Sequence, residues 1–167
     1  TERQSELIEL IKKEVKPALG CTEPIAVALA VAKAIEILEE NRFINNRLQD
    51  NFIVNIEVSS NILKNAMGVG IPGTGMVGLP IAVALGALVG KSEYQLEVLR
   101  DVTPEAVEHG KAYIAENRVS VDLKNGECDK LYIEANVETC GDMAKVVISG
   151  GHTNFEKKKK NGEVILS

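Results

Sequence analysis

The chain has 167 residues, enough for a domain with a hydrophobic core, and its net charge of −5 argues against the basic surface that nonspecific nucleic-acid binding requires. Three cysteines without a CxxC spacing give no disulfide framework, which suits a reducing compartment. The polar, acidic N-terminus does not resemble a secretory signal, so we expect a cytoplasmic protein that binds neither nucleic acid nor membrane.

Helical periodicity marks the beginning of the chain. Apolar residues at helical spacing predict an amphipathic helix that ends near Lys16, ahead of Pro17. A second helix is expected from about Pro24 to Glu40. Residues 25–32 of this helix are apolar on every side, which indicates a central, buried position.

A strand and a further buried helix are expected next. Alternating apolar and polar residues from Phe52 to Val58 predict a half-buried strand. Residues 67–90 carry no charge, but they contain seven glycines and two prolines. The helical part, from about Met76 to Val89, is too short to cross a bilayer, so we expect a core helix of a soluble protein.

The remaining sequence predicts one more helix and then strands. Thr103-Pro104-Glu105 opens a helix that runs to about Asn117, whereas Leu96–Leu99 fits either a short strand or a helical turn. The lysine run at residues 157–160 is expected beside a solvated hairpin tip at Asn161-Gly162. Turn signals separate the expected strands, which are residues 119–123, 131–137, 145–149 and 163–166.

This order of elements predicts an α+β fold. N-terminal helices, one of them buried and rich in Ala and Val, would pack on a mostly antiparallel sheet formed largely by the C-terminal third. We expect a single domain over residues 1–167, and the character of the sequence changes near residue 118.

Gly20-Cys21-Thr22-Glu23-Pro24 places a thiol where a helix is about to begin. Pro24 fits a first helical turn, and Thr22 or Glu23 can cap the free N–H groups. The positive end of the helix dipole favours the thiolate of Cys21, which is the form that ligates a metal or accepts a proton. The alternative is a small buried cysteine at a helix–loop junction.

Short polar residues cluster after the strand that ends near Val58. Ser59, Ser60, Asn61 and Asn65 can cap the next helix or bind a small polar ligand, and capping accounts for one or two of the four.

A glycine-rich loop precedes the core helix. Gly73, Thr74 and Gly75 can present N–H groups and a hydroxyl to an anion such as a substrate carboxylate, or they can form a tight loop that lets helices pack closely. With Gly78 the loop formally matches the dinucleotide motif GxGxxG. Pro72 and the upstream glycines interrupt the strand that this motif requires, which disfavours a dinucleotide site.

His152 follows two glycines at the end of an expected strand, beside Thr153 and Asn154. A histidine in this position can act as a general base or bind a carboxylate, and the alternative is a structural role. His109, the other histidine of the chain, falls on a polar helix.

Three of these blocks together carry a resemblance. Cys21–Pro24, followed by an Ala/Val-rich helix, resembles the start of the L-cysteine desulfidase family, which is similar to the alpha-chain-like domain of the iron–sulfur L-serine dehydratases. Ser59–Asn65, leading into Val69–Gly75, supports the resemblance, and Gly151–Asn154 is a third, weaker block.

The resemblance implies an oxygen-sensitive [4Fe–4S] lyase that acts on a small L-amino acid. L-Cysteine would give pyruvate, ammonia and sulfide, with dehydration of L-serine as the close variant. Catalytic roles are implied for Cys21, Glu23 and His152, and Cys21 is either a cluster ligand or the base. The implied substrate-binding residues are Thr22, Ser59, Ser60, Asn61, Asn65, Gly73, Thr74 and Gly75.

The chain departs from that family in length, because the cysteine-rich C-terminal half is absent, and Cys128 and Cys140 match no motif of the family. We therefore interpret the chain as an N-terminal portion that binds no cluster alone and takes the missing half as its partner. Exposed apolar surface would favour a homo-oligomer. The alternative functions are a dinucleotide-binding module and a non-catalytic small-molecule-binding domain.

Overall fold

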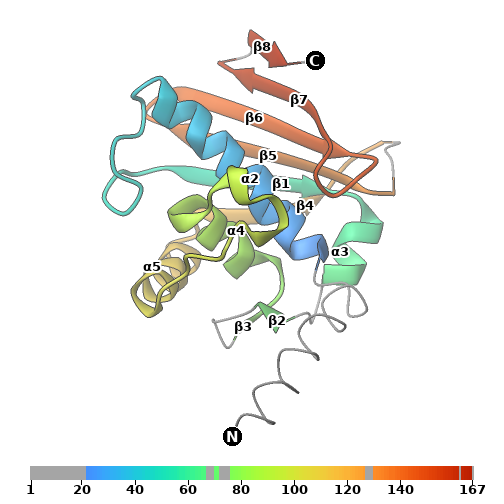
Figure 1. Cartoon of the computed structure of the whole chain (residues 1–167), viewed down its shortest axis with the longest axis horizontal. Helices are drawn as coiled ribbons and strands as arrows, with labels where there is room; N and C mark the ends of the chain where they lie inside the picture. The colour runs from blue at the N-terminus through green and yellow to red at the C-terminus, as the bar shows by residue number, and fades with distance from the viewer. Residues whose placement is uncertain (1–21, 67–69, 72–75, 127–129, 162, 167) are drawn as a thin grey trace, which may run out of the picture.

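The computed structural model describes residues 22–66, 70–71, 76–126, 130–161 and 163–166. In these residues, helices cover one face of a six-stranded mixed sheet (Figure 1), so the expected α+β fold is confirmed. The helices are α2 (Thr22–Glu40), α3 (Ser60–Ala66), α4 (Leu79–Val89), the 3₁₀ turns η1 (Ser92–Glu97) and α5 (Pro104–Ala115).

The large sheet has the strand order β4-β1-β5-β6-β7-β8. Only β1 and β4 pair in parallel, and the other four pairings are antiparallel. A separate small sheet joins β2 to β3. The strands are β1 (Ile53–Val58), β2 (Gly70–Ile71), β3 (Met76–Val77), β4 (Val119–Leu123), β5 (Tyr132–Thr139), β6 (Asp142–Ser149), β7 (Phe155–Lys160) and β8 (Glu163–Leu166).

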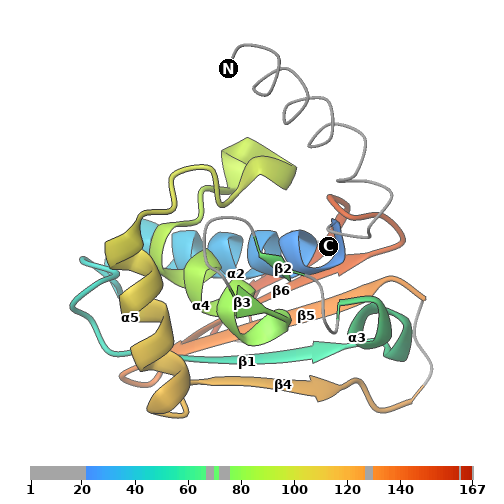
Figure 2. The same ribbon diagram turned by 90° about the horizontal axis from the view of Figure 1, so that it is seen from below.

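The register of the sheet gathers distant chain segments at one end. β1, β4 and β6 all end there, whereas β5 and β7 begin there, because β1 is parallel to β4 and antiparallel to β5. In Figure 2 this end carries α3, the turn between β6 and β7, and the start of α2. The sheet therefore brings together segments that the sequence keeps far apart.

The helices form a layer on the sheet. α2 lies across β5, β6 and β7, α4 contacts β1 and β4, and α5 packs on α4. α2 and α4 approach closely because Gly86 of α4 lies against Ala28 of α2. A Cβ atom at Gly86 would lie 2.6 Å from the carbonyl oxygen of Ala28 and 2.9 Å from its Cα.

Most expected elements are present, with shifted ends. Thr103 caps α5 as predicted, since its hydroxyl accepts the N–H of Ala106 at 3.1 Å. The core helix begins at Leu79, not near Met76, because Gly78 takes a left-handed φ of 91° and Pro80 occupies the first turn. The helix expected to end near Lys16 lies outside the described residues.

The lysine run is itself a strand, β7, which the sequence did not predict. Its register with β6 places Lys158 and Lys160 on the helix side of the sheet and Lys159 on the other face. On the helix side, Lys158 lies 4.9 Å above the ring of Phe155, and Lys160 donates to the side chain of Asn41 at 3.0 Å. Long aliphatic stems allow lysine to cover apolar surface while the charge stays near water.

Among the described residues, no helix combines the length and apolar character needed to cross a membrane. The exposed large apolar side chains lie on five different elements or loops, and the homo-oligomer stays a prediction. These side chains are Leu48, Ile53, Leu96, Leu123 and Met143.

The packing of α4 against α2 and α5 predicts different outcomes for glycine-to-alanine substitutions at Gly86 and Gly110. Gly86→Ala should lower the free energy of unfolding by roughly 1–3 kcal/mol, because the backbone of Ala28 cannot move aside. In Gly110→Ala on α5, the atom nearest to the new Cβ is the flexible end of Ile81 at 3.1 Å, and the next two lie at ordinary distances of 3.5 and 3.6 Å. Improved helix propensity should offset this contact. Denaturant unfolding of both variants measures the difference, and equal losses would contradict this account of the packing.

Candidate functional site

Two of the predicted residues meet at the end of the sheet described above. Glu23 lies in the first turn of α2, and His152 lies in the turn between β6 and β7. His152 Nε2 is 3.5 Å from Glu23 Oε1, and the two side chains are 32% and 14% exposed. The structure therefore forms a carboxylate–imidazole pair from two distant blocks of the sequence.

This pair contains buried polar atoms that lack partners. Within the described residues, Glu23 Oε2 and His152 Nε2 are buried and make no hydrogen bond. Burying such an atom without a partner costs about 1–3 kcal/mol, so most buried polar atoms in proteins are paired. A role in binding or catalysis is a physical explanation for this cost, because a ligand can supply the missing hydrogen bonds.

The predicted serine at the end of β1 has a structural role. The Ser59 hydroxyl donates to the carbonyl oxygen of Lys130 at 2.5 Å and accepts the N–H of Ile62 at 3.3 Å. Ser59 is only 4% exposed. It therefore caps α3 and ties the end of β1 to the segment before β5, and this is the capping alternative that the sequence left open.

The other polar residues of this block are exposed on α3. Ser60, Asn61 and Asn65 lie at the same end of the sheet as the Glu23–His152 pair, because α3 follows β1 and packs against α2. No hydrogen bond between described residues joins them to the pair. Their side chains remain accessible to a small polar ligand.

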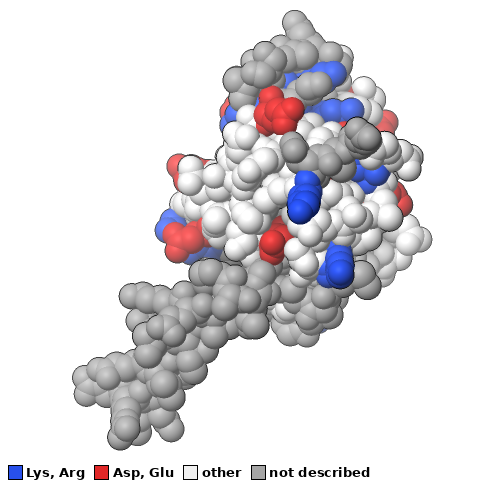
Figure 3. All heavy atoms as spheres, turned by 90° about the vertical axis from the view of Figure 1, so that its right-hand side faces the viewer, with Lys and Arg blue, Asp and Glu red and all other residues white. Residues whose placement is uncertain are grey.

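The view onto this end of the molecule shows a mostly uncharged described surface with isolated charged side chains (Figure 3). Such a surface suits a small ligand better than a polyanion. Thr22 is half-buried beside Glu23 at the start of the described part of α2. The remaining predicted site residues lie outside the described residues: Cys21, Gly73, Thr74 and Gly75.

The described residues do not fit a [4Fe–4S] cluster by themselves. Among them, no three His, Cys, Asp or Glu side chains are arranged to hold a metal ion. Cys140 is exposed in the turn between β5 and β6. The length of β6, roughly 25 Å for eight residues, separates this turn from His152. Cys128 lies outside the described residues.

A cavity of about 390 Å³ lies near the other end of α2, and its charged groups satisfy one another. Arg47 is 2.7 Å from Glu39, and Lys91 is 3.2 Å from Asp101. This cavity is therefore not the candidate functional site. Its lining residues are Glu39, Arg47, Leu88, Val89, Lys91 and Asp101.

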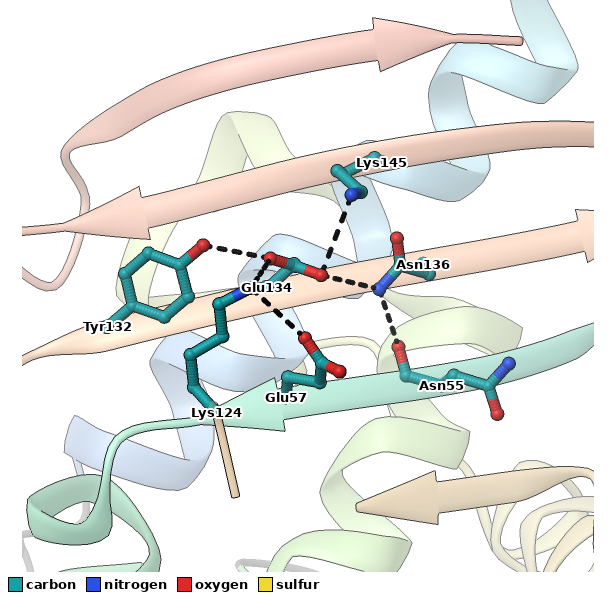
Figure 4. Close-up of polar contacts among 7 residues, drawn as sticks. All are labelled: Asn55, Glu57, Lys124, Tyr132, Glu134, Asn136 and Lys145. Carbon is teal, nitrogen blue, oxygen red and sulfur yellow. Dashed lines mark hydrogen bonds and ion pairs between the residues drawn. The ribbon is translucent and has the colours of Figure 1, made fainter. Parts of the chain in front are cut away.

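A second polar cluster lies on the helix-free face of the sheet and is centred on Glu134 of β5 (Figure 4). Lys124 Nζ lies 3.0 Å from Glu134 Oε1, and the Tyr132 hydroxyl donates to the same oxygen at 2.8 Å. Asn136 donates to Glu134 Oε2 at 3.2 Å, and Lys145 lies 3.7 Å from it. Both carboxylate oxygens are thus paired, which is typical of a structural network.

The pKa values agree with a structural role. Burial raises the pKa of Glu134, but hydrogen bonds from Lys124, Tyr132 and Asn136 outweigh burial and lower it from 4.5 to about 2. The hydrogen bond to Glu134 likewise raises the pKa of Lys124. Sequence reasoning did not find this cluster. The only available signal was the alternation of Tyr132, Glu134 and Asn136 along one face of an expected strand.

Comparisons with known proteins show close similarity to UPF0597 proteins. The one from Bacteroides fragilis is 57% identical over 164 residues, which is 98% of this chain and 36% of that protein. Those from Bacteroides thetaiotaomicron and Porphyromonas gingivalis are 57% and 47% identical, again with 36% of each protein covered. The chain spans about a third of the length of these curated relatives. No family model and no solved structure matches the chain.

Glu134→Gln should destabilise the chain at pH 7 by about 1–2 kcal/mol, because it removes the charge that Lys124 and Lys145 face. A carboxyl whose pKa falls on folding stabilises the protein above its unfolded pKa, near 4.5, and loses this contribution as the pH falls towards 2. The difference between wild type and variant should therefore shrink over that range.

Denaturant unfolding at pH 7 and near pH 3 measures both differences. Glu138→Gln is the matched control, because Glu138 is exposed on the same face of β5 and should change stability by less than about 0.5 kcal/mol. A loss that is independent of pH would show that the charge of Glu134 is not its source.

Proposed function

We propose that this chain forms the N-terminal part of a cytoplasmic iron–sulfur lyase that eliminates sulfide from L-cysteine, with elimination of water from L-serine as the close variant. The observation that supports this proposal is the contact between Glu23 and His152. This contact joins a residue of the first block of the resemblance to a residue of the third block. The second block directly follows β1, at the same end of the sheet.

Elimination from an amino acid requires removal of the α-proton and departure of the β-substituent. An imidazole can accept a proton, and a neighbouring carboxylate orients the ring and stabilises the imidazolium that forms. The Glu23–His152 pair can serve this step. Ser60 and Asn61 are exposed at the same end of the sheet, and we propose that they donate or accept hydrogen bonds with the substrate carboxylate and amino group.

If a [4Fe–4S] cluster is bound as the resemblance implies, it would supply a Lewis acid for the departing sulfide or hydroxide. Because the described residues do not fit a cluster, its ligands would be Cys21 and cysteines outside this chain, or the latter alone. The relatives are long enough to contain such residues, because this chain covers only 36% of their length.

The dinucleotide alternative gains no support from the described residues. The strand before the glycine-rich loop, β2, pairs with β3 in the small sheet, whereas the motif requires a strand of a parallel sheet before its helix.

Glu23→Gln and His152→Asn should each lower kcat for release of sulfide and pyruvate from L-cysteine by about 100-fold, the usual scale for loss of acid–base catalysis. The assay uses the full-length gene product, purified without oxygen, with L-serine tested alongside. Glu40→Gln, at the far end of α2, and His109→Asn are the matched controls. His109 forms an exposed pair with Glu105 at 3.8 Å, and both controls should retain activity.

Three outcomes separate the alternatives. Pyruvate from L-serine alone would move the protein to the dehydratase branch. Full activity in both the Glu23 and His152 variants would remove the pair from the chemistry. No turnover of either amino acid by an iron-containing wild type would overturn the lyase proposal.

Cys21→Ala should abolish turnover in the full-length gene product, whereas Cys140→Ala should not, because Cys140 is exposed at the opposite end of the sheet. Iron content distinguishes the two roles left open for Cys21. Loss of iron together with activity identifies a cluster ligand, and loss of activity with iron retained identifies a base. Wild-type activity of Cys21→Ala would exclude both roles.

A further inference from the structure

The turn that carries His152 is held by a residue that the sequence analysis did not assign. β6 ends at Ser149, and β7 begins at Phe155, so five residues form the turn. Gly150 takes a left-handed φ of 79°, and its N–H donates to the carbonyl oxygen of Leu131 at 3.1 Å. The first residue of the turn is thus fixed to the segment before β5.

Asn154 closes the turn from its other side with three hydrogen bonds. Its side-chain Nδ2 donates to the carbonyl oxygen of Ser149 at 2.7 Å. Its backbone N–H donates to the carbonyl oxygen of Gly151, and its own carbonyl oxygen accepts the N–H of Ser149, both at 3.1 Å. His152 lies inside this closed loop and faces Glu23.

The identity of residue 154 matters because the turn uses both its backbone and its amide. An aspartate has the same shape but no donor, so it would place a carboxylate against the carbonyl oxygen of Ser149. A serine keeps a donor with a shorter reach. Asparagine satisfies the carbonyl while its backbone completes the turn.

We propose that Asn154 is a positioning residue that holds the His152 imidazole against Glu23. Only the expected effect of Asn154 on turnover rests on the proposed function. The orientation of the ring can be tested in the 167-residue chain without any activity.

The first experiment records the NMR signals of the histidine rings. The chain has two histidines, so His109→Asn assigns the spectrum. Asn154→Asp should move the His152 ring signals towards those of an exposed histidine and leave His109 unchanged. Glu23→Gln should also move the His152 signals, because its side chain faces the same ring. Asn125→Asp, the same substitution in an exposed loop, is the matched control and should change neither histidine.

The second experiment measures turnover in the full-length gene product. Asn154→Asp should lower kcat by about 100-fold with little change in KM, since a displaced catalytic group loses rate more than binding. Asn154→Ser should recover part of the loss. Asn125→Asp should behave as wild type.

A folded Asn154→Asp variant with unchanged His152 signals would overturn the proposal, as would an equal effect of Asn125→Asp. If Asn154→Asp does not fold, Asn154→Ser decides by the same ring signals. If wild type turns over neither amino acid, the proposed function fails, and the ring signals still determine whether Asn154 positions His152.

Discussion

The position of α2, packed on the sheet and beside α4, is the constraint on which the rest of the structure depends. The helix is buried continuously from Pro24 to Ala32, and the approach of Ala28 to Gly86 sets its distance from α4. With neighbours on both sides, α2 is held in one direction across the strands. The first turn of α2 therefore lies beside the end of β6. Glu23 reaches the turn after β6 because packing farther along α2 fixes the direction of the helix.

Much of the fold follows from local sequence signals. The periodicity of α2, the alternation in β1 and the Thr103-Pro104 start of α5 are each contained in a few residues, and their elements are present. β7 could not be predicted in this way, because four lysines in a row show no alternation. Its strand comes from pairing with β6 and from the contacts of Lys158 and Lys160 on the helix side, which depend on tertiary structure.

The residues of the candidate site also differ in how far the sequence alone predicts their roles. Glu23 and His152 could each be selected from their motifs, but their contact depends on the register of β6 and on the direction of α2. Ser59 was selected with its neighbours, and only the structure separates its capping role from their exposure. Asn154 was visible only as part of a block. Its role depends on a hydrogen bond to Ser149 across the turn, and single-sequence reasoning gives no signal for that bond.

Two acidic residues, Glu134 and Glu23, differ in how fully their carboxylate oxygens are hydrogen-bonded. Glu134 has a partner for each carboxylate oxygen, and its pKa is lowered to about 2, so its charge serves the folded state. Glu23 and His152 each keep a buried atom that no described residue satisfies. A fold that pairs one buried carboxylate fully could also pair the other, if stability alone determined the arrangement. Under the proposed function, a ligand that brings both a hydrogen-bond donor and an acceptor, as an amino acid does, would satisfy the two buried atoms that no described residue pairs.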